Sequence, residues 1–308
     1  MMANSSHCVS SQKRPLRLPQ SNSPINRIPI EVLARILLLV CEKNRLSNGG
    51  DALYTSFVCS LWRELAFSYP ALWSNMSIFL GGDLDDEDDA DEEEDDKRDY
   101  RSYLERFEAV VDLYLERSKE HLLNLKIEAT DIWESGEHPI FTKLAKSSYR
   151  WKSVEFHVFL LKPLIYPCLG DLDLPELEEV KVWQDGDEEL GDLDVFARAP
   201  KLHSLESTLT GLSLNSTILG QIRSLVYSPD SGNFYEMIKL CPNLRNLAVQ
   251  CSPPSKHLEN QIYTSDPPRV LPITSLEVSL PGYPLKCDML QSTLSSLAAP
   301  YPYPYTSP

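Results

Sequence analysis

The chain has 308 residues, enough for one large domain or two smaller ones with a sizeable core. Its formal net charge is −16, and most of that charge lies in residues 83–99, which hold 13 acidic and 2 basic residues. No basic stripe occurs elsewhere, which argues against binding to a nucleic-acid backbone. No apolar run approaches the 18 or so residues that a membrane-spanning helix needs, so we expect no membrane partner.

The first residues, 1–23, are rich in Ser, Asn, Pro and Arg and lack both periodicity and the apolar region of a secretory signal. We predict a disordered arm there, and a disordered tail at 301–308. The seven cysteines are odd in number, irregularly spaced and without a CxxC pair, as expected for reduced thiols. These features together favour a location in the cytoplasm, the nucleus or both.

Two helices are predicted next. The first runs from about residue 29, where a proline suits the first turn, to about 43, and it is apolar on nearly every side. The second runs over 51–68 and carries two apolar rows at i, i+4 spacing. A short proline-containing turn follows at 68–73. Each helix therefore has one more apolar face than a small helical unit can bury in its own core. That extra face packs either on a partner protein or on the rest of this chain.

A six-residue frame, apolar-x-x-apolar-x-apolar, then recurs along the chain and predicts short strands. The frames begin at Trp73, Leu122, Trp151, Leu177, Leu202, Ile222, Leu244 and Ile273. Helix-compatible segments separate them at 103–118, 141–148, 194–199, 234–241 and 286–297. Strand and helix alternating every 20 to 29 residues predict an α/β fold, a leucine-rich-repeat-like solenoid over 73–300, although no frame carries the consensus Asn of such repeats.

The acidic residues interrupt the first repeat. Residues 81–99 have almost no apolar surface to bury, so they predict a disordered insertion. Such a segment is either a solvated loop or an electrostatic attractant for a basic partner protein.

The helical region carries a motif of apolar and aromatic positions. Its members are Ile28-Pro29, Glu31, Val32-Leu33, Ile36 and Val58-Cys59-x-x-Trp62. In this pattern residues 25–79 resemble an F-box followed by its connecting segment, with Ile28 in place of the usual Leu. PALW at 70–73 and YLERS at 114–118 are similar to the large F-box families of mushroom-forming fungi.

The resemblance implies a three-helix F-box domain over 24–72 that binds a Skp-type adaptor and, through it, a cullin–RING ubiquitin ligase. The adaptor contacts implied by motif position are Ile28, Pro29, Val32, Leu33, Ile36, Val58, Cys59 and Trp62. Val58 and Cys59 are equally compatible with an internal core. Trp62 either anchors the interface or holds the three helices together.

In such repeats the residues between the frame positions face outward, and that surface is the expected place for a protein substrate. The outward row comprises Asn124, Lys126, Glu155, His157, Glu179, Lys181, Trp183, Ser204, Glu206, Asn246, Ala248, Gln250 and Glu277. The candidate substrate contacts are Lys126, Glu155, His157, Glu179, Lys181, Trp183, Glu206 and Gln250. Trp183, the large aromatic among them, is either a binding anchor or packed against the next loop.

Catalytic signatures are missing from the sequence. It has no nucleophile elbow, phosphate loop or dinucleotide fingerprint, and its six histidines are scattered without metal-ligand spacing. We therefore expect no enzymatic activity, cofactor or metal. The chain is predicted to recruit a substrate to a ubiquitin ligase; the alternative is a repeat scaffold with a degenerate F-box that recruits no ligase.

Overall fold

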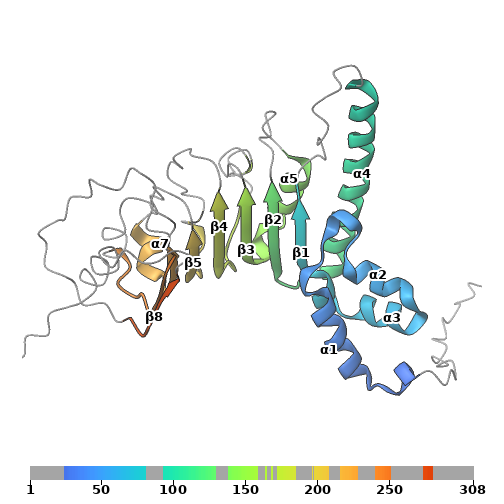
Figure 1. Cartoon of the computed structure of the whole chain (residues 1–308), viewed down its shortest axis with the longest axis horizontal. Coiled ribbons are helices and arrows are strands. Elements are labelled where there is room, and N and C mark those ends of the chain that lie inside the picture. The colour runs from blue at the N-terminus through green and yellow to red at the C-terminus, as the bar shows by residue number, and fades with distance from the viewer. Residues whose placement is uncertain are drawn as a thin grey trace, which may run out of the picture.

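The computed structural model describes residues 24–80, 93–129, 138–158, 164, 168, 172–184, 196, 198–207, 216–227, 240–250 and 273–279. Its fold is mixed α/β, with a helical unit at the N-terminal end of a parallel sheet (Figure 1). Among these residues no helix combines the length and apolar character needed to cross a membrane.

The helical unit begins with a short 3-10 turn, η1 (Pro24–Arg27), and the helix α1 (Ile30–Val40). Two further turns, η2 (Cys41–Lys43) and η3 (Leu46–Asn48), lead into α2 (Asp51–Val58). The helix predicted over 29–43 is confirmed as α1 continued by η2. The predicted turn at 68–73 is confirmed by η4 (Pro70–Trp73), which has its proline in the first turn.

The single helix predicted over 51–68 is wrong, because the structure divides it into α2 and α3 (Ser60–Ser68). Cys59 between them has extended backbone angles, φ −161° and ψ 174°. The side chain of Arg63 stabilises the break, since its Nε donates to the carbonyl of Ser56 at 3.0 Å and satisfies a group at the end of α2. The break lets α3 pack against α2 instead of continuing away from it.

Eight parallel strands form one sheet within the described residues, and each strand pairs with the next along the chain. They are β1 (Asn75–Phe79), β2 (Leu123–Ala129), β3 (Trp151–Val158), β4 (Glu179–Gln184), β5 (Ser204–Ser207), β6 (Ser224–Tyr227), β7 (Asn246–Gln250) and β8 (Ser275–Ser279). All eight predicted strands are confirmed. Parallel neighbours require a crossover connection, which explains the 20 or more residues between frames.

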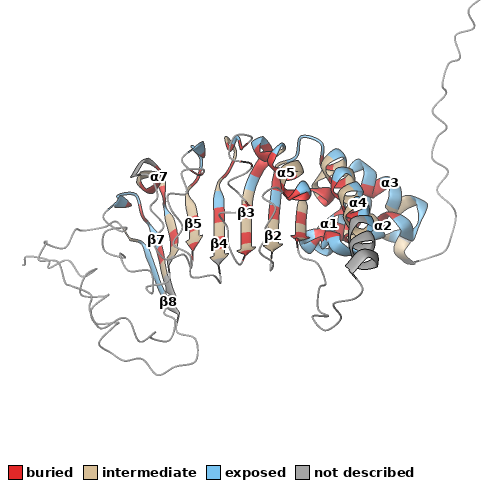
Figure 2. Ribbon diagram, turned by 90° about the horizontal axis from the view of Figure 1, so that it is seen from above, coloured by how far each residue is buried: buried red, intermediate tan, exposed pale blue. Residues whose placement is uncertain are grey.

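Burial alternates along β1 to β7, as the frame predicted (Figure 2), but not along β8, whose described residues 275–277 are all exposed. On β3, Val154 and Phe156 are buried, whereas Glu155 between them is part-exposed. The helix α5 (Pro139–Ala145) covers the buried face, where Phe141 lies 6.4 Å from Phe156 and 6.3 Å from Trp151 between ring centroids. On β1 to β7 the described frame positions thus form a continuous core, and the residues between them face away from it, whereas Leu276 of β8 is 44% exposed.

The connections differ in part from expectation. The helix α4 (Glu93–Ser118) begins inside the acidic insertion predicted to be disordered, so residues 93–99 are helical, and 81–92 lie outside the described residues. The helix α7 (Ser216–Gln221) was not predicted. The disordered ends predicted at 1–23 and 301–308 and the helix predicted at 286–297 lie outside the described residues. The helices predicted at 194–199 and 234–241 fall on residues that the structure describes only in part.

Buried hydrogen bonds and aromatic contacts join the helical unit to the sheet. The Asn44 side chain is 0% exposed, and its Nδ2 donates to the carbonyls of Leu72 at 2.8 Å and Asn75 at 3.1 Å. Its Oδ1 accepts from the Ala52 backbone N–H at 2.9 Å and the Tyr114 hydroxyl at 3.3 Å. Nearby, the buried Trp73 indole meets the Tyr114 ring edge-on at 4.9 Å, and its Nε1 donates to the Ala66 carbonyl. These contacts connect η2, α2, η4, β1 and α4.

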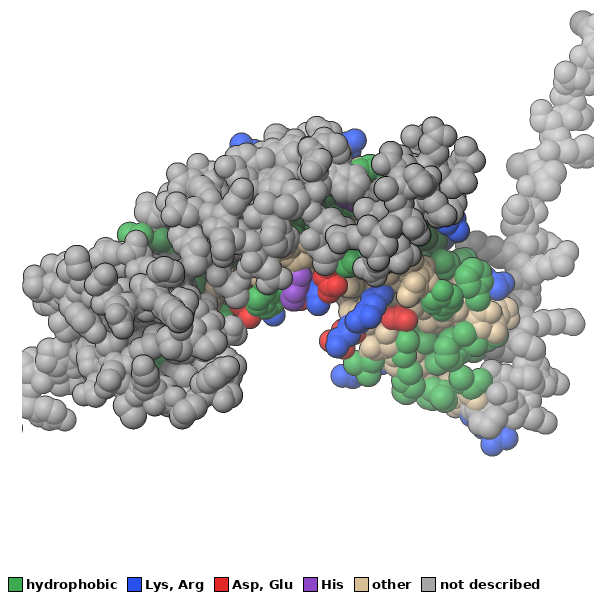
Figure 3. All heavy atoms as spheres, turned by 45° about the horizontal axis from the view of Figure 1, so that its top comes forward, with side chains coloured by type: hydrophobic (Ala, Val, Ile, Leu, Met, Phe, Trp, Pro, Cys, Tyr) green, Lys and Arg blue, Asp and Glu red, His purple; other side chains and the backbone are tan. Residues whose placement is uncertain are grey.

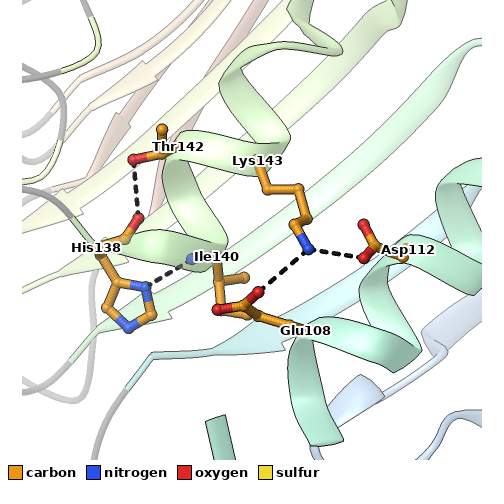
Figure 4. Close-up of polar contacts among 6 residues, drawn as sticks. All are labelled: Glu108, Asp112, His138, Ile140, Thr142 and Lys143. Carbon is orange, nitrogen blue, oxygen red and sulfur yellow. Dashed lines mark hydrogen bonds and ion pairs between the residues drawn. The ribbon is translucent and has the colours of Figure 1, made fainter. Parts of the chain in front are cut away.

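Polar contacts also hold α5 in place (Figure 4). Lys143 Nζ lies 2.7 Å from Asp112 Oδ2 and 3.3 Å from Glu108 Oε2, both on α4. His138 caps the N-terminus of α5, because its Nδ1 accepts from the Ile140 backbone N–H at 3.2 Å. This cap requires the neutral imidazole, since a protonated Nδ1 donates instead of accepting.

We expect His138 to make the stability of the chain fall in mild acid. Burial lowers the pKa of His138 to about 4, against an opposing influence from Glu108. The unfolded chain takes up this proton near the ordinary pKa, so the contribution is complete above pH 6.5 and declines as pH falls to about 4, by roughly 3 kcal/mol in the free energy of unfolding. His138→Asn keeps an oxygen acceptor but does not titrate.

Urea unfolding of the native chain and His138→Asn at pH 7 and pH 4.5 tests this expectation. Other titrating groups affect both proteins alike, so the native chain should lose about 2 kcal/mol more than the variant over this interval. Equal losses in the two proteins would show that His138 does not titrate differently in the folded state.

Candidate partner-binding surfaces

The helix α1 has two apolar faces in the structure, and only one of them is buried. Leu33, Ala34 and Leu37 are no more than 3% exposed and pack in the core. On the other face lie Val32, Ile36, Leu39 and Val40, at 50%, 41%, 68% and 52% exposure. Their spacing of i, i+4, i+7 and i+8 puts them on one stripe, which we call the α1 stripe.

A second exposed apolar group lies at the end of α2. Tyr54, Phe57 and Val58 are 57%, 63% and 60% exposed and share a face at i, i+3 and i+4 spacing. Figure 3 shows hydrophobic side chains gathered on the surface of the helical unit. Clustered apolar side chains on a surface indicate an interaction site, whereas isolated ones do not.

The sequence-predicted adaptor contacts lie mostly on this surface. Pro29, Val32, Ile36, Val58 and Cys59 are exposed, and Ile28 is part-exposed. Leu33 is the exception, because its side chain is 2% exposed within the core and a partner cannot reach it without displacing that core. Whether the others contact an adaptor stays a prediction.

Trp62 is part-exposed and packs against the buried core of the helical unit. Its indole Nε1 is buried and has no acceptor among the described residues. This position fits a Trp62 that holds the helices together better than it fits a Trp62 presented freely as an interface anchor.

Several exposed apolar residues were missed by the sequence reasoning. They are Ile30, Leu39, Val40, Tyr54 and Phe57. The signal was present in the spacing, since Leu39 and Val40 continue the row that Val32 and Ile36 begin.

The outward face of the sheet is the second candidate surface. Every residue predicted for it is exposed or part-exposed wherever its side chain is described, and Gln250 is placed in β7 without a described side chain. The strand register aligns Lys126, Glu155, Lys181 and Glu206 in one row across β2 to β5. Their charges alternate in sign along this row.

Two aromatic rings meet on the same face. His157 and Trp183 are partners in the register of β3 and β4, and their ring centroids lie 4.3 Å apart. The Glu155 carboxylate lies 2.7 Å from His157 Nε2. Trp183 is part-exposed, and its ring lies against His157 of the neighbouring strand. It is therefore neither a freely presented ring nor a fully packed one.

The described residues contain no group of three or more His, Cys, Asp or Glu side chains arranged to hold a metal ion. Burial raises the pKa of the Cys41 thiol to about 11 and that of Cys241 to about 12. Such thiols stay protonated and are poor nucleophiles or metal ligands at neutral pH. The raised pKa values of both thiols are explained by the burial of Cys41 and Cys241 in the core.

Two surfaces thus carry candidate functional residues: exposed apolar stripes on the helical unit, and a row of charged and aromatic side chains on the sheet. No protein-family model matches the chain, and no curated protein or solved structure matches it either. These two surfaces and the motif in the sequence are what the described part of the chain offers a binding partner.

Proposed function

We propose that this chain is the substrate-recruiting subunit of an SCF-type cullin–RING ubiquitin ligase. The helical unit acts as the F-box and binds a Skp-type adaptor, and the strands with their connections form a leucine-rich-repeat-like solenoid that presents a target protein. The observation that carries the proposal is α1, which buries one apolar face and exposes the α1 stripe.

An uncovered stripe of this size is unfavourable in water. Fully burying a Val, Leu or Ile side chain contributes about 1.5–3 kcal/mol, so a partner that covers Val32, Ile36 and Leu39 gains several kcal/mol before the costs of association. The motif positions that resemble an F-box supply the identity of that partner, because Pro29, Val32 and Ile36 belong both to the motif and to the exposed surface.

The chain itself contributes no catalytic group in this proposal. Holding a target lysine near the ubiquitin-charged conjugating enzyme turns an encounter between two molecules into a local reaction, which is a large rate effect. The chain then needs only two binding surfaces, one for the adaptor and one for the target.

One observation favours a second candidate, a protein-binding repeat scaffold with a degenerate F-box. Leu33 matches an adaptor-contact position of the motif but lies in the core. If the motif's contact positions have taken over structural roles, the helical unit closes one end of the solenoid and recruits no ligase.

The two candidates predict different behaviour toward a Skp-type adaptor. We expect residues 24–308 co-expressed with the adaptor to co-elute with it from a size-exclusion column. Val32→Asp with Ile36→Asp places two charges in the α1 stripe and should weaken the complex at least about 100-fold. Both side chains are at least 41% exposed, so circular dichroism should show an intact fold.

Tyr149→Asp is the matched control, because Tyr149 is 47% exposed and lies on η5 (Ser148–Arg150), away from the helical unit. This variant should bind the adaptor like the native chain. A folded native chain that elutes apart from the adaptor would reject the ligase proposal and favour the scaffold.

A further inference from the structure

The lysines on the outward face of the sheet are neutralised by carboxylates of the same face. Lys126 Nζ lies 2.9 Å from Glu128 Oε1 and 3.4 Å from Glu155 Oε1. Lys181 Nζ lies 3.5 Å from Glu206 Oε2. Attractive pairs across neighbouring strands hold these side chains in place, so neither ammonium is free to attract an anionic ligand.

Carboxylates are in excess on this face. Glu179 and Glu277 are exposed, and no ion pair joins either of them to another described residue. Five carboxylates and two ammonium groups occupy the outward positions that the strand register aligns, a net charge of −3 with His157 counted as neutral; Lys152, also exposed on β3, lies at a bulge outside this register. The neighbouring ion pair, Lys152 with Glu178 at 3.8 Å, precedes Glu179 and leaves its carboxylate uncompensated.

An aromatic platform lies on the same strand as Glu179. The ring of Trp183 lies tilted by 33° against that of His157, with the centroids 4.3 Å apart, and Lys181 Nζ already lies 5.9 Å from the centre of the Trp183 ring. An indole face attracts cations and also accepts the aliphatic part of a long side chain. Glu179 and Trp183 are four positions apart, about 13 Å along an extended strand.

Beside these charges runs a row of mostly small, uncharged polar side chains. The register aligns Asn75, Asn124, Ser153, Ser204 and Ser224 across the sheet, with Glu179 between Ser153 and Ser204. Asn124 Nδ2 donates to Asn75 Oδ1 at 2.7 Å. Amide and hydroxyl groups at strand spacing suit the backbone groups of an extended peptide.

We propose that the outward face of β2 to β5 binds a basic segment of the target protein, with an Arg or Lys ion-paired to Glu179 and a neighbouring side chain on Trp183. The proposal rests on the function proposed above and names its substrate class. The sign of the face selects this occupant: nucleic acid and acidic peptides meet a net negative surface whose cations are already paired. The acidic residues 83–99 add to the same long-range attraction.

Selection from a random peptide library tests the proposal without a known target. Peptides of about 12 residues are long enough to cover the Glu179–Trp183 distance and the neighbouring strands. The library is displayed on phage and selected on the full chain, and recovered peptides are measured by fluorescence anisotropy. We expect Arg or Lys to be enriched at a common position.

Variants of the face then decide where these peptides bind. Glu179→Gln should weaken the selected peptides about fivefold, and Trp183→Ala about tenfold. Glu64→Gln, an exposed carboxylate on α3 of the helical unit, is the matched control and should leave affinity within about twofold, as expected for a screened charge outside the sheet. All three positions are exposed or part-exposed, so the fold should be retained.

The outcomes separate the two proposals. Selection that yields no peptide, peptides without basic enrichment, or basic peptides that bind the Glu179 and Trp183 variants unchanged would each overturn the inference; the last would assign binding to the acidic segment. A Glu179→Gln, Trp183→Ala double variant should still co-elute with the adaptor, because the α1 stripe is untouched. Peptide binding without adaptor binding in the native chain would reject the ligase function and leave the basic-segment surface standing.

Discussion

Gly50→Ala should lower the free energy of unfolding by about 3 kcal/mol or more. Gly50 precedes α2 with φ +79°, a conformation that side chains disfavour. A Cβ built there would lie within 3.0 Å of the Tyr114 hydroxyl and ring and of Leu46 Cδ2. Tyr114 is fully buried against Trp73, so its ring cannot move aside cheaply. Urea unfolding followed by circular dichroism measures the loss.

Two other glycines separate backbone strain from the clash. Gly49→Ala shares the positive φ of +90°, but its Cβ would meet nothing closer than 3.6 Å, so we expect a loss of only about 1 kcal/mol from strain. Gly220→Ala lies in α7 with nothing within 4 Å and should stabilise that helix slightly, by about 0.5–1 kcal/mol. Similar losses for Gly50→Ala and Gly49→Ala would mean that the Tyr114 contact contributes little.

Asn44→Ala should cost about 3–4 kcal/mol, because it removes the Asn44 partner from three buried hydrogen bonds and one part-buried one. The other partners in these bonds are the Ala52 N–H, the Leu72 and Asn75 carbonyls and the Tyr114 hydroxyl. Each lies where the helical unit meets the sheet, and the backbone carbonyl of Asn44 also accepts from the Ser77 N–H at 2.7 Å. The loss should therefore appear as a lower midpoint of one cooperative urea transition.

Asn124→Ala is the matched control for Asn44→Ala. The Asn124 side chain also donates a hydrogen bond, to Asn75 Oδ1 at 2.7 Å, but it is exposed and water replaces its partner. We expect a change below about 1 kcal/mol. Equal effects of the two substitutions would indicate that burial of the Asn44 network contributes little to stability.

The strands were predictable because their cause is local. A strand with one buried face needs apolar residues at alternate positions, and the same frame recurs wherever a strand joins the sheet. The outward direction of Lys126, Glu155 and Lys181 follows from the same alternation. Helix α7 was missed because Ser216–Gln221 is short and has only Ile218 and Leu219 as described buried residues, too few to display a helical period.

The break at Cys59 was not visible in the sequence. The apolar rows of α2 and α3 continue in phase across it, so periodicity alone predicts one helix. The interruption is stabilised by the Arg63 side chain reaching the Ser56 carbonyl, and by packing of α3 on α2. Contacts of this kind depend on where the chain turns, which a helical pattern does not encode.

By itself the sequence determined the eight strands, their outward residues and the excess of apolar surface on α1. Only the tertiary structure decided which face of α1 is buried, placing Leu33 in the core and leaving Val32 and Ile36 exposed. It also brought Asn44 to Tyr114, 70 residues away, and paired Lys181 with Glu206. Alternation and amphipathicity are local consequences of backbone geometry, whereas these pairings depend on strand register and close packing between distant segments.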